Sequence, residues 1–136
     1  MLIFHERIEI AESIFKYLKE IGFAAGIYHS KMPVKERLTN ISEFRDGKTD
    51  ILIACRALDE GFDAPAAETG IIVAGTSSVR QWIQRMGRIL RKSLSKEYSK
   101  IYVIFANIVE QDIFAKKDLV DFEKEAIAVE LINLKN

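Results

Sequence analysis

The chain has 136 residues, 49% of them apolar, which is enough for one domain with a hydrophobic core and too apolar for an intrinsically disordered chain. Twenty basic and twenty acidic side chains cancel, so no overall charge attracts nucleic acid. Cys55 is the only cysteine and there are two histidines, which excludes an intrachain disulfide, a cysteine-rich zinc site and a histidine metal cluster.

The first half of the chain alternates short apolar runs with amphipathic segments. Residues 2–4 form an apolar strand at the start. Apolar residues at helical spacing then predict a helix that ends at Gly22: Ile8, Ala11, Ile14, Phe15, Leu18 and Ile21. Residues 23–28 predict a second strand, and Pro33 suits the first turn of a second helix. That helix should bury Val34, Leu38, Ile41 and Phe44.

The second half continues the same alternation. Residues 50–55, 71–74 and 101–106 predict three further strands, with a helix after residue 78. Continuous apolar strands alternating with amphipathic helices predict an α/β fold, with a mainly parallel sheet covered by helices on both faces. No apolar run reaches membrane-spanning length and the N-terminus has no signal pattern, so we expect an intracellular protein without a membrane partner.

Charge is segregated along the chain. Seven basic residues and one acidic residue, Glu97, fall in residues 80–100, whereas acidic residues outnumber basic ones after residue 107. This distribution is expected if one face meets phosphate. Residues 108–136 combine many charges with scattered apolar positions, and we expect a helical C-terminal extension there.

The run of residues 84–91 concentrates the basic charge. Arg85, Arg88 and Arg91 recur every third residue on a segment whose apolar stripe is Val79, Trp82, Ile83, Met86, Ile89 and Leu90. An ordinary solvated helix face is one interpretation. The other is a phosphate contact, because the planar guanidinium pairs bidentately with phosphate oxygens.

The order of segments favours the phosphate interpretation. A buried strand, residues 51–54, leads into the loop Asp59-Glu60-Gly61-Phe62-Asp63, and a second buried strand and a small turn precede the arginine run. These segments resemble motifs V and VI of superfamily 2 helicases, and residues 2–6 resemble motif IV. The resemblance covers about residues 2–107 and is nearest to XPB-like DNA translocases.

The resemblance implies a RecA-like fold, a three-layer sandwich in which the sheet lies between helices. In this family ATP binds between two RecA-like domains. This sequence has no G-x-x-x-x-G-K-[ST] loop and no acidic box for magnesium. The expected cofactor, ATP with Mg²⁺, would therefore need a preceding Walker A/B domain, absent from residues 1–136, to hold the metal.

The arginine run would supply the other half of the ATP site. Arg88 and Arg91 match the two arginine fingers of motif VI, and Gln84 matches the residue that opens the motif. Arg85 either contacts the nucleotide or pairs with an acidic residue of its own domain. Gly87 either permits close helix packing or is a tolerated helical glycine.

Two residues of the motif V loop would complete the ATP contacts. Gly61 and Asp63 match the glycine and aspartate that meet the ribose side of the nucleotide. The alternative is an ordinary turn in which Asp63 is solvated or pairs with Arg85. Glu60 stands where many RNA helicases carry arginine, which points away from the DEAD-box branch.

Loops at the strand ends would hold the nucleic-acid backbone without reading bases. The candidate residues are His5, His29, Ser30, Lys31, Cys55, Arg56 and Thr76. A thiol is a weak donor, so a direct phosphate contact from Cys55 is doubtful, and Thr76 could instead cap the following helix. Trp82 is assigned to the core.

The sequence therefore indicates the C-terminal motor domain of an ATP-dependent superfamily 2 DNA helicase or translocase, with RNA not excluded. Its partners would be DNA and the N-terminal RecA-like domain of the same polypeptide. A stand-alone nucleic-acid-binding or protein-interaction module without ATPase activity is the alternative. A free-standing Rossmann enzyme is disfavoured, because no G-x-G-x-x-G follows the first strand.

Overall fold

The computed structural model describes residues 1–56, 67–74, 79–90 and 99–105, together with Val109 and Asp112. The chain divides into two compact units, Met1–Ala106 and Asn107–Asn136. The first unit holds the helices and strands discussed below. The helical extension expected at residues 108–136 falls almost wholly outside the described residues and stays a prediction. In the described part, no helix is both long enough and apolar enough to cross a lipid bilayer.

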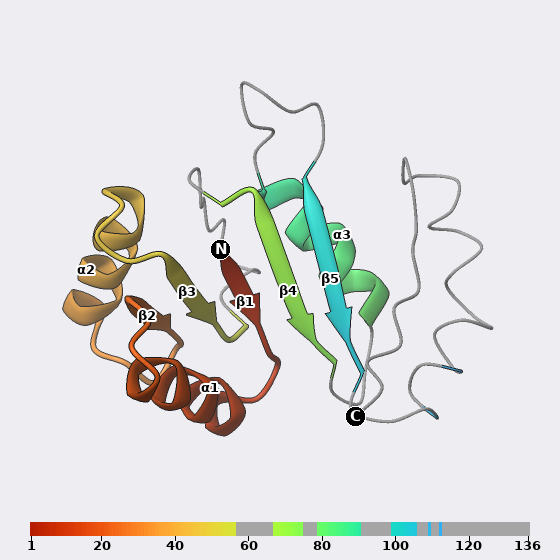
Figure 1. Ribbon diagram of the computed structural model, residues 1–136, viewed down its shortest axis with the longest axis horizontal. Coiled ribbons are helices and arrows are strands. Elements are labelled where there is room, and N and C mark those ends of the chain that lie inside the picture. The colour runs from red at the N-terminus through yellow and green to blue at the C-terminus, as the bar shows by residue number, and fades with distance from the viewer. Residues whose placement is uncertain (57–66, 75–78, 91–98, 106–108, 110–111, 113–136) are drawn as a thin grey trace. The chain divides into compact units, whose positions relative to one another are not determined.

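Within the described residues, five parallel strands form one sheet in the order β2-β3-β1-β4-β5 (Figure 1). They are β1 (Leu2–Phe4), β2 (Ala25–Tyr28), β3 (Ile51–Ala54), β4 (Thr69–Val73) and β5 (Lys100–Ile104). All five strands were predicted from their apolar runs. The parallel arrangement confirms the α/β fold class and agrees with the RecA-like sandwich that the sequence resemblance implied.

In the part of the chain that the structure describes, three helices cover the sheet: α1 (Ile8–Glu20), α2 (Val34–Arg45) and α3 (Val79–Ile89). The α1 crossover runs from β1 outward to β2, whereas the α2 and α3 crossovers run in the opposite direction across the sheet. Because parallel crossovers keep one hand, opposite directions place the helices on opposite faces. Core contacts agree, with α1 on one face and α2 and α3 on the other.

The core follows the two-residue period of the strands. On the face of α2 and α3, Leu2 and Phe4 pack with Leu52, Ile72 and the helix residues. On the face of α1, the intervening residues of the same strands gather: Ile3, Ile27, Ile51, Ile53 and Cys55. Gly22 ends the first helix as predicted, with a φ of 93° that a side chain would disfavour.

The prediction for α2 was wrong in its first two turns. Val34 and Leu38 are 61% and 62% exposed, whereas Phe44 is 3% exposed. The helix packs on β2 and β3, at the edge of the sheet, so only its last turn reaches the core. Apolar spacing predicted the helix correctly, but could not predict that its first turns lie beyond the sheet.

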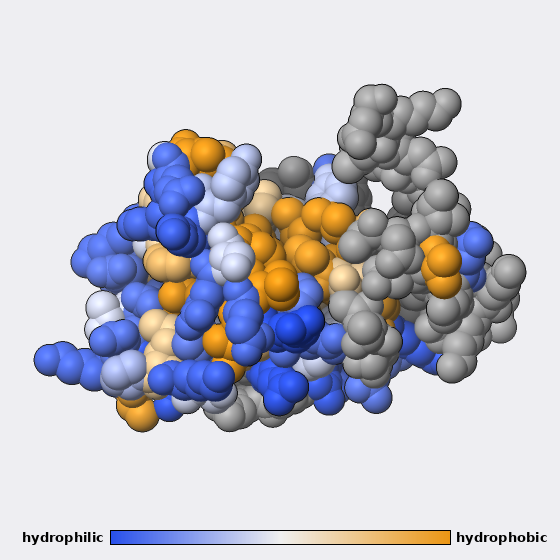
Figure 2. All heavy atoms as spheres, turned by 90° about the horizontal axis from the view of Figure 1, so that it is seen from below, coloured by the Kyte–Doolittle hydropathy of each residue, from blue (hydrophilic) through white to orange (hydrophobic). Residues whose placement is uncertain are grey.

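A groove of about 360 Å³ lies on the α1 face, between that helix and strands β1, β4 and β5. Its walls are almost entirely apolar, with Ile3, Ile14, Ile71, Val73 and Ile104 among them. Figure 2 shows apolar residues gathered in an exposed patch on the surface of the described residues. Helix α1 therefore covers its face mainly over β2 and β3.

Candidate functional site

Strand register brings three of the expected nucleic-acid segments together. Phe4 is opposite Ala54, and Ala54 is opposite Tyr28, so His5, Cys55 and His29 leave the sheet side by side. Backbone hydrogen bonds extend one residue past the strands: His5 N–H donates to the Ala54 carbonyl at 3.2 Å, and Cys55 N–H donates to the Tyr28 carbonyl at 3.0 Å. His5, Cys55 and His29 therefore form a continuous row at the carboxyl edge of the sheet.

The two histidines in this row are buried, each 5% exposed. The Arg7 N–H donates to His5 Nδ1 at 2.9 Å, which fixes the turn into α1. His29 Nε2 lies 3.2 Å from Glu12 Oε1 on the same helix, and its Nδ1 has no hydrogen-bond partner among the described residues. Both rings therefore hold α1 on the sheet edge, and any contact with nucleic acid is left to their backbone or neighbours.

Cys55 is also buried, at 1% exposure. Burial raises the pKa of its thiol, which the nearby Arg56 charge only partly offsets. The side chain is therefore a neutral thiol at neutral pH, packed with Ile3 and Ile53 on the α1 face. This environment places the Cys55 side chain in the core, and its nucleic-acid contact stays a prediction.

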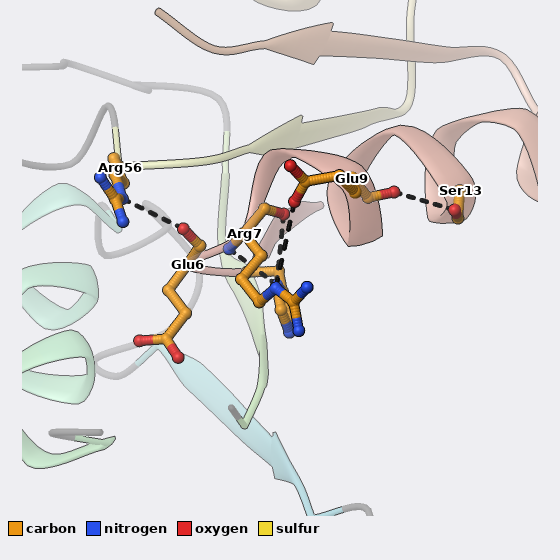
Figure 3. A network of polar contacts seen from close by, with 6 residues as sticks. Glu6, Arg7, Glu9, Ser13 and Arg56 are labelled. Carbon is orange, nitrogen blue, oxygen red and sulfur yellow. Dashed lines mark hydrogen bonds and ion pairs between the residues drawn. The ribbon is translucent and has the colours of Figure 1, made fainter. Parts of the chain in front are cut away.

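The exposed residues of the row are Ser30, Lys31 and Arg56. Arg56 has a φ of 57°, in the left-handed region that non-glycine residues seldom occupy. Its Nε donates to the Glu6 carbonyl at 3.2 Å, so the side chain crosses the carboxyl end of β1 (Figure 3). Strained backbone of this kind often marks functional positions. Thr76 lies outside the described residues.

Helix α3 places its polar residues as its sequence predicted. Met86, Ile89 and Leu90 are buried against the sheet, whereas Gln84 and Arg88 are exposed. Gln84 and Arg88 are four residues apart and so share one helix face. That face does not pack on the core, and the guanidinium of Arg88 on it can bind a phosphate. Arg91, Gly61 and Asp63 lie outside the described residues, so their assignments stay predictions.

Arg85 has a contact that the sequence did not predict. Its guanidinium carbon lies 4.9 Å from the centroid of the Trp82 ring, a cation–π arrangement. Trp82 in turn lies against Phe4, with ring centroids 4.0 Å apart, and packs on the core as expected. The contacts from Phe4 through Trp82 to Arg85 link β1 to α3. Arg85 therefore has a structural contact within its own domain, with an aromatic ring.

Gly70 in β4 determines how closely α3 approaches the sheet, a role that was not predicted from the sequence. A Cβ there would overlap Met86 Sδ, and would lie 2.8 Å from Met86 Cγ and 3.2 Å from Leu90 Cδ1. Only glycine leaves room for the fully buried Met86 at this point. The residue was missed because the strand was predicted to begin at residue 71, one position later.

Gly87 does not pack closely, although that was one interpretation of it. A Cβ at Gly87 would meet only Ile101 Cδ1 among the described residues, at 4.0 Å. The residue is exposed, in the last turn of α3. Within the described residues, nothing in this domain requires a glycine there.

Gly87→Ala should therefore stabilise the isolated chain by about 0.5–1 kcal/mol, because alanine has the higher helix propensity. Denaturant unfolding monitored by circular dichroism measures the change. A loss of stability would show that residue 87 meets an atom outside the described residues. Gly47→Ala is a useful contrast, since its φ of 72° should make the same substitution destabilising.

Known proteins resemble this chain in both sequence and fold. The DNA 3'-5' translocase XPB2 of Sulfurisphaera tokodaii is 44% identical over 57 residues, which is 42% of this chain and 13% of that protein. The UvrABC system protein B of Oceanobacillus iheyensis is 34% identical over 93 residues, 65% of this chain and 14% of that protein. The chain thus spans less than a sixth of either relative.

The solved structures agree on the fold. The RNA helicase Prp28 from Chaetomium thermophilum, in its ADP-bound crystal structure, superposes with a TM-score of 0.71 at 20% identity, over 94% of this chain and 31% of that one. Residues 1–93 match the family described as the helicase conserved C-terminal domain. Since this match includes β1, the sheet edge and α3, the chain belongs to the superfamily 2 helicases, as their C-terminal RecA-like domain.

Proposed function

We propose that this chain is the second half of an ATP-dependent DNA helicase or translocase motor, inside the cell. The observation that carries the proposal is α3. Its buried side is locked to the sheet through Gly70 and Met86, while Gln84 and Arg88 point away from the core. A helix that is held rigidly on the sheet can present an exposed arginine to a phosphate bound by another domain.

Arg88, with Arg91 three residues later, would act as arginine fingers. When bound, ATP with Mg²⁺ supplies the transferable γ-phosphate, and the magnesium would be held by the N-terminal RecA-like domain. The planar Arg88 guanidinium would stabilise charge that develops on the phosphate oxygens. Gln84, on the same face one turn earlier, would position the phosphate, and Gly61 and Asp63 would meet the ribose.

The carboxyl edge of the sheet would hold the nucleic-acid backbone. Arg56 and Lys31 are exposed cations on this edge, and phosphate contacts of this kind carry no base preference. We propose DNA as the strand, since the translocase with 44% identity is named for DNA. The RNA helicase in the fold comparison is only 20% identical, so it supports the fold alone.

The isolated chain should fold and show no ATPase activity, with or without DNA, because the sequence offers no loop to cradle the phosphates. Adding the RecA-like domain that carries a Walker A loop, joined to this chain or as a separate protein, should restore DNA-stimulated turnover. A phosphate-release assay measures both. Turnover by the purified 136-residue chain alone would overturn the half-site proposal, provided an inactive matched preparation shows none. Failure of every such domain to restore turnover would favour a stand-alone binding module.

A further inference from the structure

One acidic side chain at the carboxyl edge of the sheet, Glu9, is influenced by the charges of three basic residues. Glu9, in the first turn of α1, has an oxygen 4.0 Å from Arg7 Nε. Both side chains are about two-thirds exposed, at 67% and 66%. Figure 3 shows Arg7 and Glu9 pointing toward each other, and Arg56 directed at the Glu6 carbonyl.

The third cation comes from the end of β2. Met32 N–H donates to the His29 carbonyl at 3.2 Å, which closes a turn containing Lys31. A hydrogen bond from its own backbone N–H lowers the pKa of Glu9, and the charges of Lys31, Arg7 and Arg56 lower it further. The ends of β1, β2 and β3 thus each contribute one basic residue to the surroundings of a single carboxylate.

The backbone of Arg56 is held in an unfavourable conformation. Its φ of 57° is unfavourable for a residue with a side chain, and the hydrogen bond to Glu6 uses only its Nε. The outer edge of a guanidinium can still donate to phosphate oxygens. An ion pair with an exposed carboxylate would not explain why Arg56 holds this unfavourable backbone conformation, because surface ion pairs contribute little stability.

We propose that Arg7, Lys31 and Arg56 form a site for one backbone phosphate of a nucleic-acid strand, and that Glu9 occupies this site in the free domain. A phosphate must displace the Glu9 carboxylate in order to bind. Glu9 therefore limits the affinity of this domain for a strand, and allows release when the rest of the motor does not hold it. The inference rests on the nucleic-acid contact proposed above, and adds the residue that regulates it.

The test is the binding of labelled oligothymidine to the 136-residue chain by fluorescence anisotropy. Glu9→Gln removes the competing charge and should tighten binding about three- to tenfold at low salt. The gain should shrink as salt rises toward about 0.5 M, because exposed charges are then screened. Glu9→Lys, which adds a fourth cation, should bind at least as tightly.

Glu20→Gln is the matched control. Glu20 ends the same helix, is similarly exposed at 61%, and pairs with Lys16 at 4.0 Å. It lies about 16 Å from Glu9 along the helix axis, beyond a screening length of about 10 Å at 0.1 M salt. Removing its charge changes the net charge equally and should leave binding as in the unmodified chain. Equal gains from both variants would reduce the effect to net charge and overturn the inference.

Arg56→Ala separates this inference from the proposed function. It should weaken binding by the unmodified chain, and in the double variant with Glu9→Gln it should remove most of the gain. If Arg56→Ala weakens binding but Glu9→Gln changes nothing, the phosphate contact stands and the role of Glu9 is refuted. If the unmodified chain and every variant fail to bind while thermal melting shows them folded, the nucleic-acid contact and this inference are both refuted.

Discussion

Arg88→Ala should lower the kcat of the assembled two-domain motor by about 10³–10⁵ and leave the fold of this chain almost unchanged. The side chain is exposed on α3, so its removal opens no cavity. Its charge, however, would meet the phosphate only in the transition state. Arg88→Lys should restore little, because an ammonium lacks the planar fork. ATP hydrolysis of the assembled motor and thermal melting of the isolated chain measure the two effects.

Arg45→Ala is the control for Arg88→Ala. Arg45 occupies the last turn of α2 as Arg88 occupies the last turn of α3, and both are exposed. Each loss removes a charge that complements a helix dipole. Only Arg88→Ala should lose ATPase activity. If it unfolds the chain, or leaves hydrolysis intact in the assembled motor, the helix face is structural and the arginine-finger assignment is wrong.

Gly70→Ala should destabilise the chain by about 1–3 kcal/mol, because its Cβ has no space under α3. Met86 is fully buried in the cluster that contains Leu90, so any shift of its side chain disturbs the packing of α3. A shift of α3 itself would displace Arg88 as well. The variant should therefore also lower the kcat of the assembled motor, although residue 70 touches no substrate. Urea unfolding and ATPase assays measure the two losses.

The double variant Gly70→Ala with Met86→Ala isolates the cause. Met86→Ala alone should cost about 2–5 kcal/mol through the cavity it leaves. Because the new methyl group at residue 70 would partly fill that cavity, the double variant should be more stable than the sum of the single effects predicts. Gly26→Ala, in β2, is the control: its Cβ would lie 3.4 Å from Leu52 Cδ1, an ordinary contact. Additive losses, or an equal loss at Gly26, would refute the close-approach argument.

Some of this architecture was predictable from local pattern alone. The apolar stripe of α3 predicted which side is buried, and burial of Met86 and Ile89 confirms it. The apolar runs predicted all five strands and the parallel fold. These features depend on the period of a helix or strand, which is a property of neighbouring residues and is written in the sequence.

Other features depend on what lies opposite a residue. The same apolar spacing that predicted α2 failed for Val34 and Leu38, because the helix sits at the sheet edge. The pairing of Arg85 with the Trp82 ring was not foreseen, since several partners were compatible with its charge. The outcome for both depended on tertiary neighbours.

The sequence by itself determined the family, the order of the elements and which side of α3 is buried. Only the tertiary structure decided that His5, Cys55 and His29 end in one row and that Gly70, not Gly87, provides the room between α3 and the sheet. It also decided that the charges of Arg7, Lys31 and Arg56 act on Glu9. The physical reason is the range of the interactions. Periodicity acts over one or two turns, whereas strand register and close packing join residues that are tens of positions apart.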